Sequence, residues 1–141
     1  MMKMLCALLT GCALLLMTGC NRNPATDATP TADGAARSTV LELDDTTFSM
    51  QTARGVVLVD FWAPWCPPCR KQGPIVDAVA KQLGGTARVA KVNVDNAKAT
   101  AQAFGIRSIP TLVVLKDGKT VKSFTGLTQA DALVAAVKEA L

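Results

Sequence analysis

The chain has no histidine, and only two of its five cysteines, Cys66 and Cys69, are spaced as a Cys-x-x-Cys pair. A structural zinc site needs four nitrogen or sulfur ligands, usually from two such pairs or from one pair and two histidines. Neither set is present. The sequence therefore argues against a zinc site, and we expect neither a metal nor another cofactor.

A strong excess of charge is also missing. Lysine and arginine total 15 against 11 aspartates and glutamates, which gives a net charge of +4, and the basic residues are scattered. Nucleic-acid-binding domains instead gather basic residues into a patch or stripe. The composition therefore gives no reason to expect nucleic-acid binding. A length of 141 residues suits one domain, which we expect to be monomeric.

No hydrophobic run is long enough to cross a bilayer comfortably. The apolar stretch from Leu5 to Met17 has 13 residues and follows the positive charge of Lys3. A membrane-spanning helix needs about 20 such residues. The pattern instead predicts an export signal of the lipoprotein type over residues 1–19.

The end of that signal, the sequence MTGC at residues 17–20, resembles the lipobox at which bacterial lipoproteins are cut and lipidated on the cysteine. Lipidation of Cys20 would leave the mature chain with one cysteine pair and no free thiol, which suits an oxidising compartment. The sequence LTGC at residues 9–12 fits the pattern better locally, but it would leave a very short apolar stretch. An ordinary cleaved signal with an incidental Cys20, or an uncleaved anchor, are the alternatives.

Residues 20–37 are predicted to comprise the lipidated cysteine and a flexible linker. The segment 21–31 contains two prolines and no large apolar side chain, so it cannot pack into a core. A flexible coil of this length has an rms reach of roughly 20–25 Å. We therefore expect a folded domain over residues 38–141, tethered at the periplasmic side of a bacterial membrane.

The domain itself has the pattern of alternating strands and helices. Residues 56–62 are apolar on both faces, as expected of a central strand, and the Asp-Gly pair at residues 117–118 predicts a hairpin. Expected strands cover residues 39–43, 56–62, 87–94, 111–116 and 119–124, with helices at Phe48, after Cys66, from Asn96 to Phe104 and after Thr128. This order predicts an α/β fold, a mixed central sheet with helices on both faces.

Side chains that can cap these helices stand near their expected ends. Asp44 or Asp45 precedes the first helix and Asn96 the third. Thr128, with Asp131 three residues later, has the spacing of a capping box before the last helix. The pair of glycines at residues 84–85 predicts the end of the helix that follows Cys66.

The strongest chemical signal is the sequence WCPPC at residues 65–69, just after the central strand. Two cysteines three apart at the start of a helix lie on one face and can bond to each other. The helix N-terminus lowers the pKa of Cys66, and its thiolate can attack a substrate disulfide, after which Cys69 resolves the mixed disulfide. A purely structural disulfide is the weaker interpretation, because so small a loop would stabilise the fold little.

Asp60 interrupts the apolar central strand. Burying a carboxylate there is costly unless the group has a use. Burial would raise the pKa of Asp60, so that it could exchange a proton near neutrality. The alternative is an aspartate at the strand end whose carboxylate is hydrogen-bonded to the backbone.

Three segments resemble the signature sequences of thioredoxin: DFWAPWCPPC at residues 60–69, AKVNVD at 90–95 and FGIRSIPT at 104–111. The resemblance covers residues 39–141 and implies a thioredoxin fold. It also implies that Asp60 acts as acid and base for Cys69, with Lys91 nearby. The substrate groove of the family implies docking roles for the cis-proline loop Ile109-Pro110 and for Gly126. Trp65, which flanks the cysteine pair, is expected to be a surface contact for partners.

The dipeptide between the cysteines departs from that family, which usually has Gly-Pro where this chain has Pro67-Pro68. Prolines add rigidity and remove N–H donors, and Pro67 is biased away from helical geometry by the proline after it. Rigidity and the loss of donors can oppose each other in setting the reduction potential. The dipeptide therefore leaves the direction of electron flow open.

Together these features predict an extracytoplasmic thiol–disulfide oxidoreductase that reduces disulfides through Cys66 and Cys69. Its substrates would be exported proteins with disulfides, with apocytochromes c among the candidates. Because export places the protein in an oxidising compartment, it would need a membrane-bound electron donor. The alternatives are a thiol oxidase that uses the same pair, and a non-catalytic docking module that keeps the fold.

Overall fold

The computed structural model describes residues 39–141. The predicted signal peptide, Cys20 and the linker lie outside the described residues. The elements follow in the order β1 (Leu41–Leu43), α1 (Phe48–Thr52), β2 (Val56–Trp62), α2 (Pro67–Leu83), β3 (Arg88–Asn93), α3 (Lys98–Ala103), β4 (Thr111–Lys116), β5 (Lys119–Thr125) and α4 (Ala130–Ala140). This alternation confirms the predicted order, with ends that shift by a few residues.

The strands form one sheet in the order β1-β3-β2-β4-β5, with β2 at its centre. β2 runs parallel to β3 and antiparallel to β4. β5 returns antiparallel to β4 through a hairpin at Asp117 and Gly118. These two residues have φ values of +50° and +75°, the left-handed conformations that so tight a turn requires. The mixed sheet confirms the predicted α/β fold.

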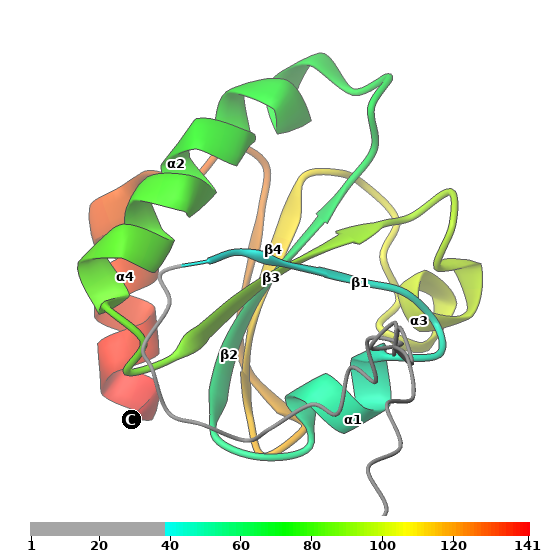
Figure 1. The fold of residues 1–141 in the computed structure, drawn as a ribbon. Helices are drawn as coiled ribbons and strands as arrows, with labels where there is room; N and C mark the ends of the chain where they lie inside the picture. The colour runs from blue at the N-terminus through cyan, green and yellow to red at the C-terminus, as the bar shows by residue number, and fades with distance from the viewer. Residues whose placement is uncertain (1–38) are drawn as a thin grey trace, which may run out of the picture. The chain divides into compact units, whose positions relative to one another are not determined.

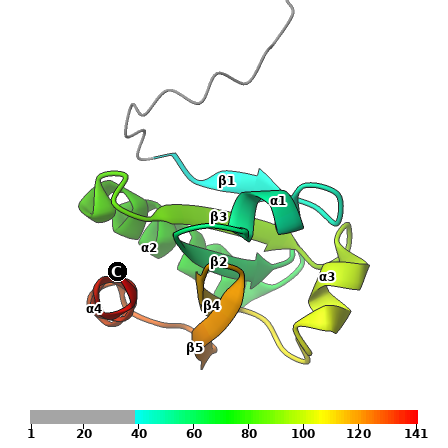
Figure 2. The ribbon, with the colours of Figure 1, turned by 90° about the horizontal axis from the view of Figure 1, so that it is seen from below.

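Helices cover both faces of the sheet. Figures 1 and 2 show α2 and α4 on one face and α1 and α3 on the other. Successive side chains of β2 point alternately to these two layers. Val56 and Leu58 pack with α2 and α4, whereas Val57 and Val59 pack on the side of α1 and α3. By this alternation Asp60 lies on the same side of β2 as Leu58, facing α2.

α2 carries the cysteine pair at its start and ends at Gly84. This glycine adopts a left-handed conformation, φ +54°, and its N–H donates to the carbonyl of Ala80, so the predicted helix end is confirmed. α2 has 17 residues. Of the helices in residues 39–141, none is both long and apolar enough to cross a membrane.

The cap of α3 differs from the prediction. Asn96 does not cap this helix, and Ala97 at the N-cap position makes no side-chain hydrogen bond. Instead the carboxylate of Asp45 accepts hydrogen bonds from the N–H of Thr100 at 2.7 Å, from its hydroxyl at 2.6 Å and from the N–H of Ala99 at 3.2 Å. The cap therefore comes from a residue 54 positions before Ala99 in the chain.

The start of α4 also differs from the prediction. Thr128 does not cap α4: its hydroxyl donates to the carbonyl of Gly126 at 3.1 Å, and its backbone N–H and C=O pair with the side chain of Gln72. Gln129 takes the N-cap position without a side-chain hydrogen bond. At α1 the N-cap residue is Thr47, which makes no side-chain cap hydrogen bond. The carboxylate of Asp44 instead accepts hydrogen bonds from the N–H groups of Thr46 and Thr47, just before the helix, at 3.0 and 2.9 Å.

Candidate active site

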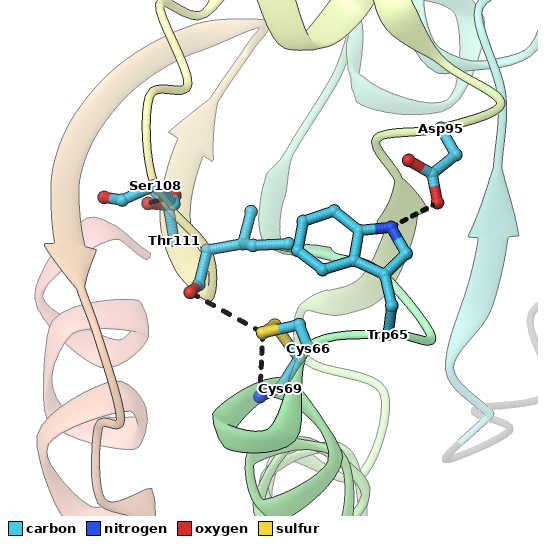
Figure 3. Close-up of a disulfide and its surroundings, with 7 residues drawn as sticks. Trp65, Cys66, Cys69, Asp95, Ser108 and Thr111 are labelled. Atoms are coloured by element: carbon cyan, nitrogen blue, oxygen red, sulfur yellow. Dashed lines mark hydrogen bonds between the residues drawn. A yellow bond between two sulfur atoms is a disulfide. The ribbon is translucent and has the colours of Figure 1, made fainter.

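The two cysteines meet at the start of α2. Cys66 occupies the N-cap position in an extended conformation, with φ −93° and ψ 108°, and Cys69 lies in the first turn. Their Cα atoms are 5.3 Å apart and their sulfurs form a disulfide, as Figure 3 shows. Both residues are buried. The bond joins two side chains on one face of a helix end.

The sulfur of Cys66 receives a single backbone hydrogen bond from the first turn of α2. The N–H of Cys69 donates to the Cys66 sulfur at 3.3 Å. Pro67 and Pro68 occupy the first two helical positions and have no N–H to offer. The expected bias of Pro67 against helical geometry is overcome, since α2 begins at this residue. In the reduced protein, this one donor and the positive end of the helix dipole favour a thiolate at Cys66.

The loop before β4 lies against the disulfide. The Ile109–Pro110 peptide bond is cis, as the resemblance to thioredoxin implies. The carbonyl oxygen of Ile109 is 3.6 Å from the Cys66 sulfur. Gly126, at the end of β5, donates its N–H to the carbonyl of Pro110 at 2.7 Å. Its φ of +90° suits glycine. Two predicted docking segments therefore meet beside the cysteine pair.

Trp65 precedes the pair and is exposed over 65% of its surface. Its indole Nε1 donates a hydrogen bond to the carboxylate of Asp95 at 2.9 Å. Figure 3 shows the ring lying beside the disulfide with its nitrogen turned toward Asp95. The hydrogen bond fixes the orientation of a large apolar surface that is open to solvent. Such a surface can contact a protein partner.

Asp60 is fully buried. Among the described residues, neither of its carboxylate oxygens has a hydrogen-bond partner. The structure therefore does not support the alternative of an aspartate bonded to the backbone. The pKa of Asp60 is raised to about 7. Burial is the main cause, the positive charge of Lys91 opposes it by lowering the pKa, and the negative charge of Glu42 adds to it. A carboxyl group with this pKa can take up or release a proton at neutral pH.

Lys91 is half-buried and lies opposite Asp60 in the pairing of β2 with β3. Its Nζ is 4.6 Å from the centre of the Trp62 ring, a cation–π distance. An alternating strand can place a lysine fully in solvent, but this lysine is not so placed. Lys91 also lines an open cleft of about 400 Å³ with Glu42, Asp77 and Lys81, among others. The side chain of Lys91 thus extends from the neighbourhood of the buried Asp60 to a cleft that is open to solvent.

Sequence reasoning missed two residues of this region. Asp95 follows β3 at the edge of the sheet where Trp65 follows β2, and the parallel pairing of these strands could have suggested their contact. Gln72 is buried on α2 at helical spacing with Val76 and Val79, so a polar residue in an apolar stripe was the available signal. In the part of the chain that the structure describes, no three metal-ligating side chains come together.

Comparisons with known proteins identify the family. The thioredoxin family model matches residues 39–139. Thioredoxin from Bacillus subtilis (strain 168) is 42% identical over 94 residues, which cover 67% of this chain and 90% of the relative. Thioredoxin 1 from Synechococcus elongatus is 45% identical over 91 residues, 63% of this chain and 85% of the relative. The solved structure of a mutant thioredoxin from Halobacterium salinarum NRC-1 has a TM-score of 0.71 and 37% identity, covering 77% of this chain and 96% of that chain. The chain therefore belongs to the thioredoxin family and is a thiol–disulfide oxidoreductase whose redox pair is Cys66 and Cys69.

Proposed function

We propose that the protein reduces disulfides in exported proteins while a lipid on Cys20 holds it at the periplasmic side of a bacterial membrane. One observation supports this chemistry. The Cys66–Cys69 pair lies at the start of α2, and the buried carboxyl group of Asp60 lies on the face of β2 that α2 covers. The pair can move two electrons, and the carboxyl group can move a proton.

The exchange starts from the dithiol form. The Cys66 thiolate attacks one sulfur of the substrate disulfide, whose S–S bond breaks as a mixed disulfide forms. The other substrate sulfur leaves as a thiolate and takes up a proton. The deprotonated Cys69 then attacks the Cys66 sulfur and releases the second substrate sulfur. Two electrons have passed to the substrate, and the protein is left with the disulfide seen in the structure.

Asp60 serves the second attack in this mechanism. With a pKa of about 7 it can accept the proton of the Cys69 thiol and later return it to solvent. The charge of Lys91 lowers the pKa of Asp60 and thereby keeps part of the population ionised at neutral pH. Lys91 therefore supports the base without touching the sulfur atoms.

The substrate chain docks beside the pair. The backbone of Ile109 and Pro110 and the loop at Gly126 form one rim, and the exposed indole of Trp65 provides an apolar contact. An extended peptide can pair its backbone with such a rim while its own disulfide faces Cys66.

The surroundings of the Cys66 sulfur support reduction over oxidation. Strongly oxidising pairs owe their potential to a stabilised reduced form, in which the thiolate has a very low pKa. Here two prolines leave one helical N–H within reach of the sulfur. Fewer donors stabilise the thiolate less, which favours the oxidised protein and makes the dithiol a better reductant.

The cysteine content supports the location. Cleavage before Cys20 and lipidation of this residue would leave only the redox pair as thiols in the mature chain. A dithiol in an oxidising compartment must be regenerated, so we include a membrane-bound electron donor. Exported proteins with disulfides, including apocytochromes c, are the proposed substrates.

Insulin reduction tests the enzyme activity. Cys66→Ser should abolish it, because the attacking thiolate is gone. Cys69→Ser should retain the first attack and accumulate mixed disulfides. Full activity of the Cys66→Ser protein would refute the mechanism, and biological activity in a variant with both cysteines changed to alanine would indicate a docking module instead.

Two further measurements test direction and location. Alkylation trapping in cells should find the Cys66–Cys69 pair mainly as dithiol, whereas a pair held mainly as disulfide would indicate a thiol oxidase. Mass spectrometry of the mature N-terminus should find an acylated Cys20. An unmodified N-terminus cut elsewhere would refute the lipid tether.

A further inference from the structure

Gln72 is a polar side chain in the apolar interface between α2 and the rest of the domain. It lies one turn after Cys69 and is fully buried, next in the stripe to Val76. Burial of an amide is unfavourable unless hydrogen bonds satisfy it. Packing alone would favour an apolar residue at this position, so the contacts of the amide group are informative.

Both ends of the Gln72 amide bind the backbone of one residue. Nε2 donates to the carbonyl oxygen of Thr128 at 3.0 Å, and Oε1 accepts the N–H of Thr128 at 2.8 Å. This two-point contact joins α2 to the loop between β5 and α4. The same contact occupies the backbone of the residue that sequence patterns assign as the cap of α4.

The clamped loop continues into the docking rim. The Thr128 hydroxyl donates to the carbonyl of Gly126 at 3.1 Å, and the Gly126 N–H donates to the carbonyl of Pro110 at 2.7 Å. The next carbonyl back along the chain, that of Ile109, lies 3.6 Å from the Cys66 sulfur. A chain of polar contacts therefore starts at Gln72 in α2 and ends at Cys66, the N-cap residue of the same helix.

We propose that Gln72 is a positioning residue that holds the loop Gly126–Thr128 in place as one wall of the substrate groove. Leu127, at the centre of this loop, is 47% exposed and is presented to solvent by a backbone fixed on both sides. A loop ordered in advance loses less conformational entropy when a protein substrate binds. Gln72 thus affects the affinity for protein disulfides. The reactivity of the Cys66 sulfur depends instead on the N-terminus of α2.

Gln72→Met tests this assignment. Methionine keeps a similar length, but leaves the N–H and C=O of Thr128 without their partners. We expect KM for a protein disulfide such as insulin to rise by about tenfold, equivalent to about 1.4 kcal/mol. The rate of Cys66 with a small disulfide, which does not need the groove, should change less than about twofold by the same argument. Gln72→Glu retains an acceptor for the Thr128 N–H and should give an intermediate KM.

Thr100→Val is the matched control. Thr100 is also buried and hydrogen-bonded across the fold, to Asp45, but it belongs to α3 and not to the groove. Both variants are compared by thermal unfolding and circular dichroism. Loss of stability without a rise in KM is expected for Thr100→Val.

A KM for Gln72→Met that rises no more than that of Thr100→Val would overturn the proposal. An equal loss of rate with small and protein disulfides would overturn it as well, since the effect would then lie at the sulfurs. The proposal rests on a substrate groove, but not on the direction of electron flow. If the wild-type protein oxidises thiols instead, the reductase function fails, while KM for a reduced protein substrate still tests Gln72.

Discussion

β2 presents one face to α1 and α3 and the other to α2 and α4, and the two faces bury different chemistry. On the first face the rings of Phe48, Phe61 and Phe104 pack together, with centroids 5.1–6.4 Å apart. On the second face Asp60 is buried without a partner among the described residues, and Gln72 approaches from α2. The first arrangement stabilises the fold. The second arrangement lowers stability, because it buries a carboxyl group without a hydrogen-bond partner near the cysteine pair.

The difference between the two faces explains how the fold can bury the carboxyl group of Asp60 and remain stable. Dispersion and burial on the aromatic face are spread over many contacts and need no particular protonation state. The carboxyl group on the other face is unfavourable in its charged form, which is the form that accepts a proton. Stability and function are thus assigned to side chains one position apart on the same strand.

The largest expected effect comes from the aromatic face. Phe61→Ala should lower the free energy of unfolding by about 3–5 kcal/mol, because it leaves a cavity beside the rings of Phe48 and Phe104. Denaturant unfolding measures this loss. The folded fraction should keep its exchange rate with a small disulfide. A loss below about 1 kcal/mol would show that this face is not the main source of stability.

Asp60→Asn should reveal a dependence of stability on pH. The folded-state pKa of about 7 lies above the ordinary value of 3.8, so the folded protein holds a proton that the unfolded chain releases first. The favourable contribution is complete below pH 3.8 and is lost as pH rises through 7. Relative to the variant, the wild type should lose up to about 4 kcal/mol between pH 4 and pH 8.

A flat difference between the two proteins across that pH range would contradict the raised pKa. Because the asparagine side chain of the variant cannot ionise, subtracting the variant's curve removes the contributions of the other carboxyl groups. These include Asp44, whose hydrogen bonds with Thr46 and Thr47 lower its pKa to about 2. The comparison therefore isolates one group.

The same variant should slow the second step of catalysis. Without a carboxylate to accept the Cys69 proton, release of substrate from the mixed disulfide should slow by about 100-fold at pH 7. Single-turnover kinetics measure this step, and alkylation of Cys66 serves as the control for the first step. Equal slowing of both steps would indicate a general disturbance of the helix end.

Lys91→Met should have the smallest effect. Removing the positive charge lets the pKa of Asp60 rise above about 7, so less of the base is ionised at neutral pH. The release rate at pH 7 should fall by roughly twofold to fivefold, and its pH profile should move to higher pH. An unchanged profile would show that Lys91 acts only through its contact with Trp62.

Local signals in the sequence predicted much of the fold. The apolar run of β2, the turn at Asp117 and Gly118, and the end of α2 at Gly84 were predictable because each depends on residues that are close in the chain. The helix caps of α3 and α4 were not. At α3 the carboxylate of Asp45 reaches the helix terminus from a distant segment, and a tertiary hydrogen bond satisfies a helix terminus as well as a local one does. At α4 the N-cap residue, Gln129, makes no side-chain hydrogen bond.

The candidate site divides in the same way. The sequence by itself determined the cysteine pair, its place before a helix, and the lack of N–H groups at Pro67 and Pro68, because these are covalent or short-range properties. Only the tertiary structure decided that Asp60 is buried without hydrogen-bond partners among residues 39–141 and that Gln72 is hydrogen-bonded to the backbone of Thr128. The reason is physical: burial and partner choice depend on segments that meet through packing, and no pattern within one segment contains them.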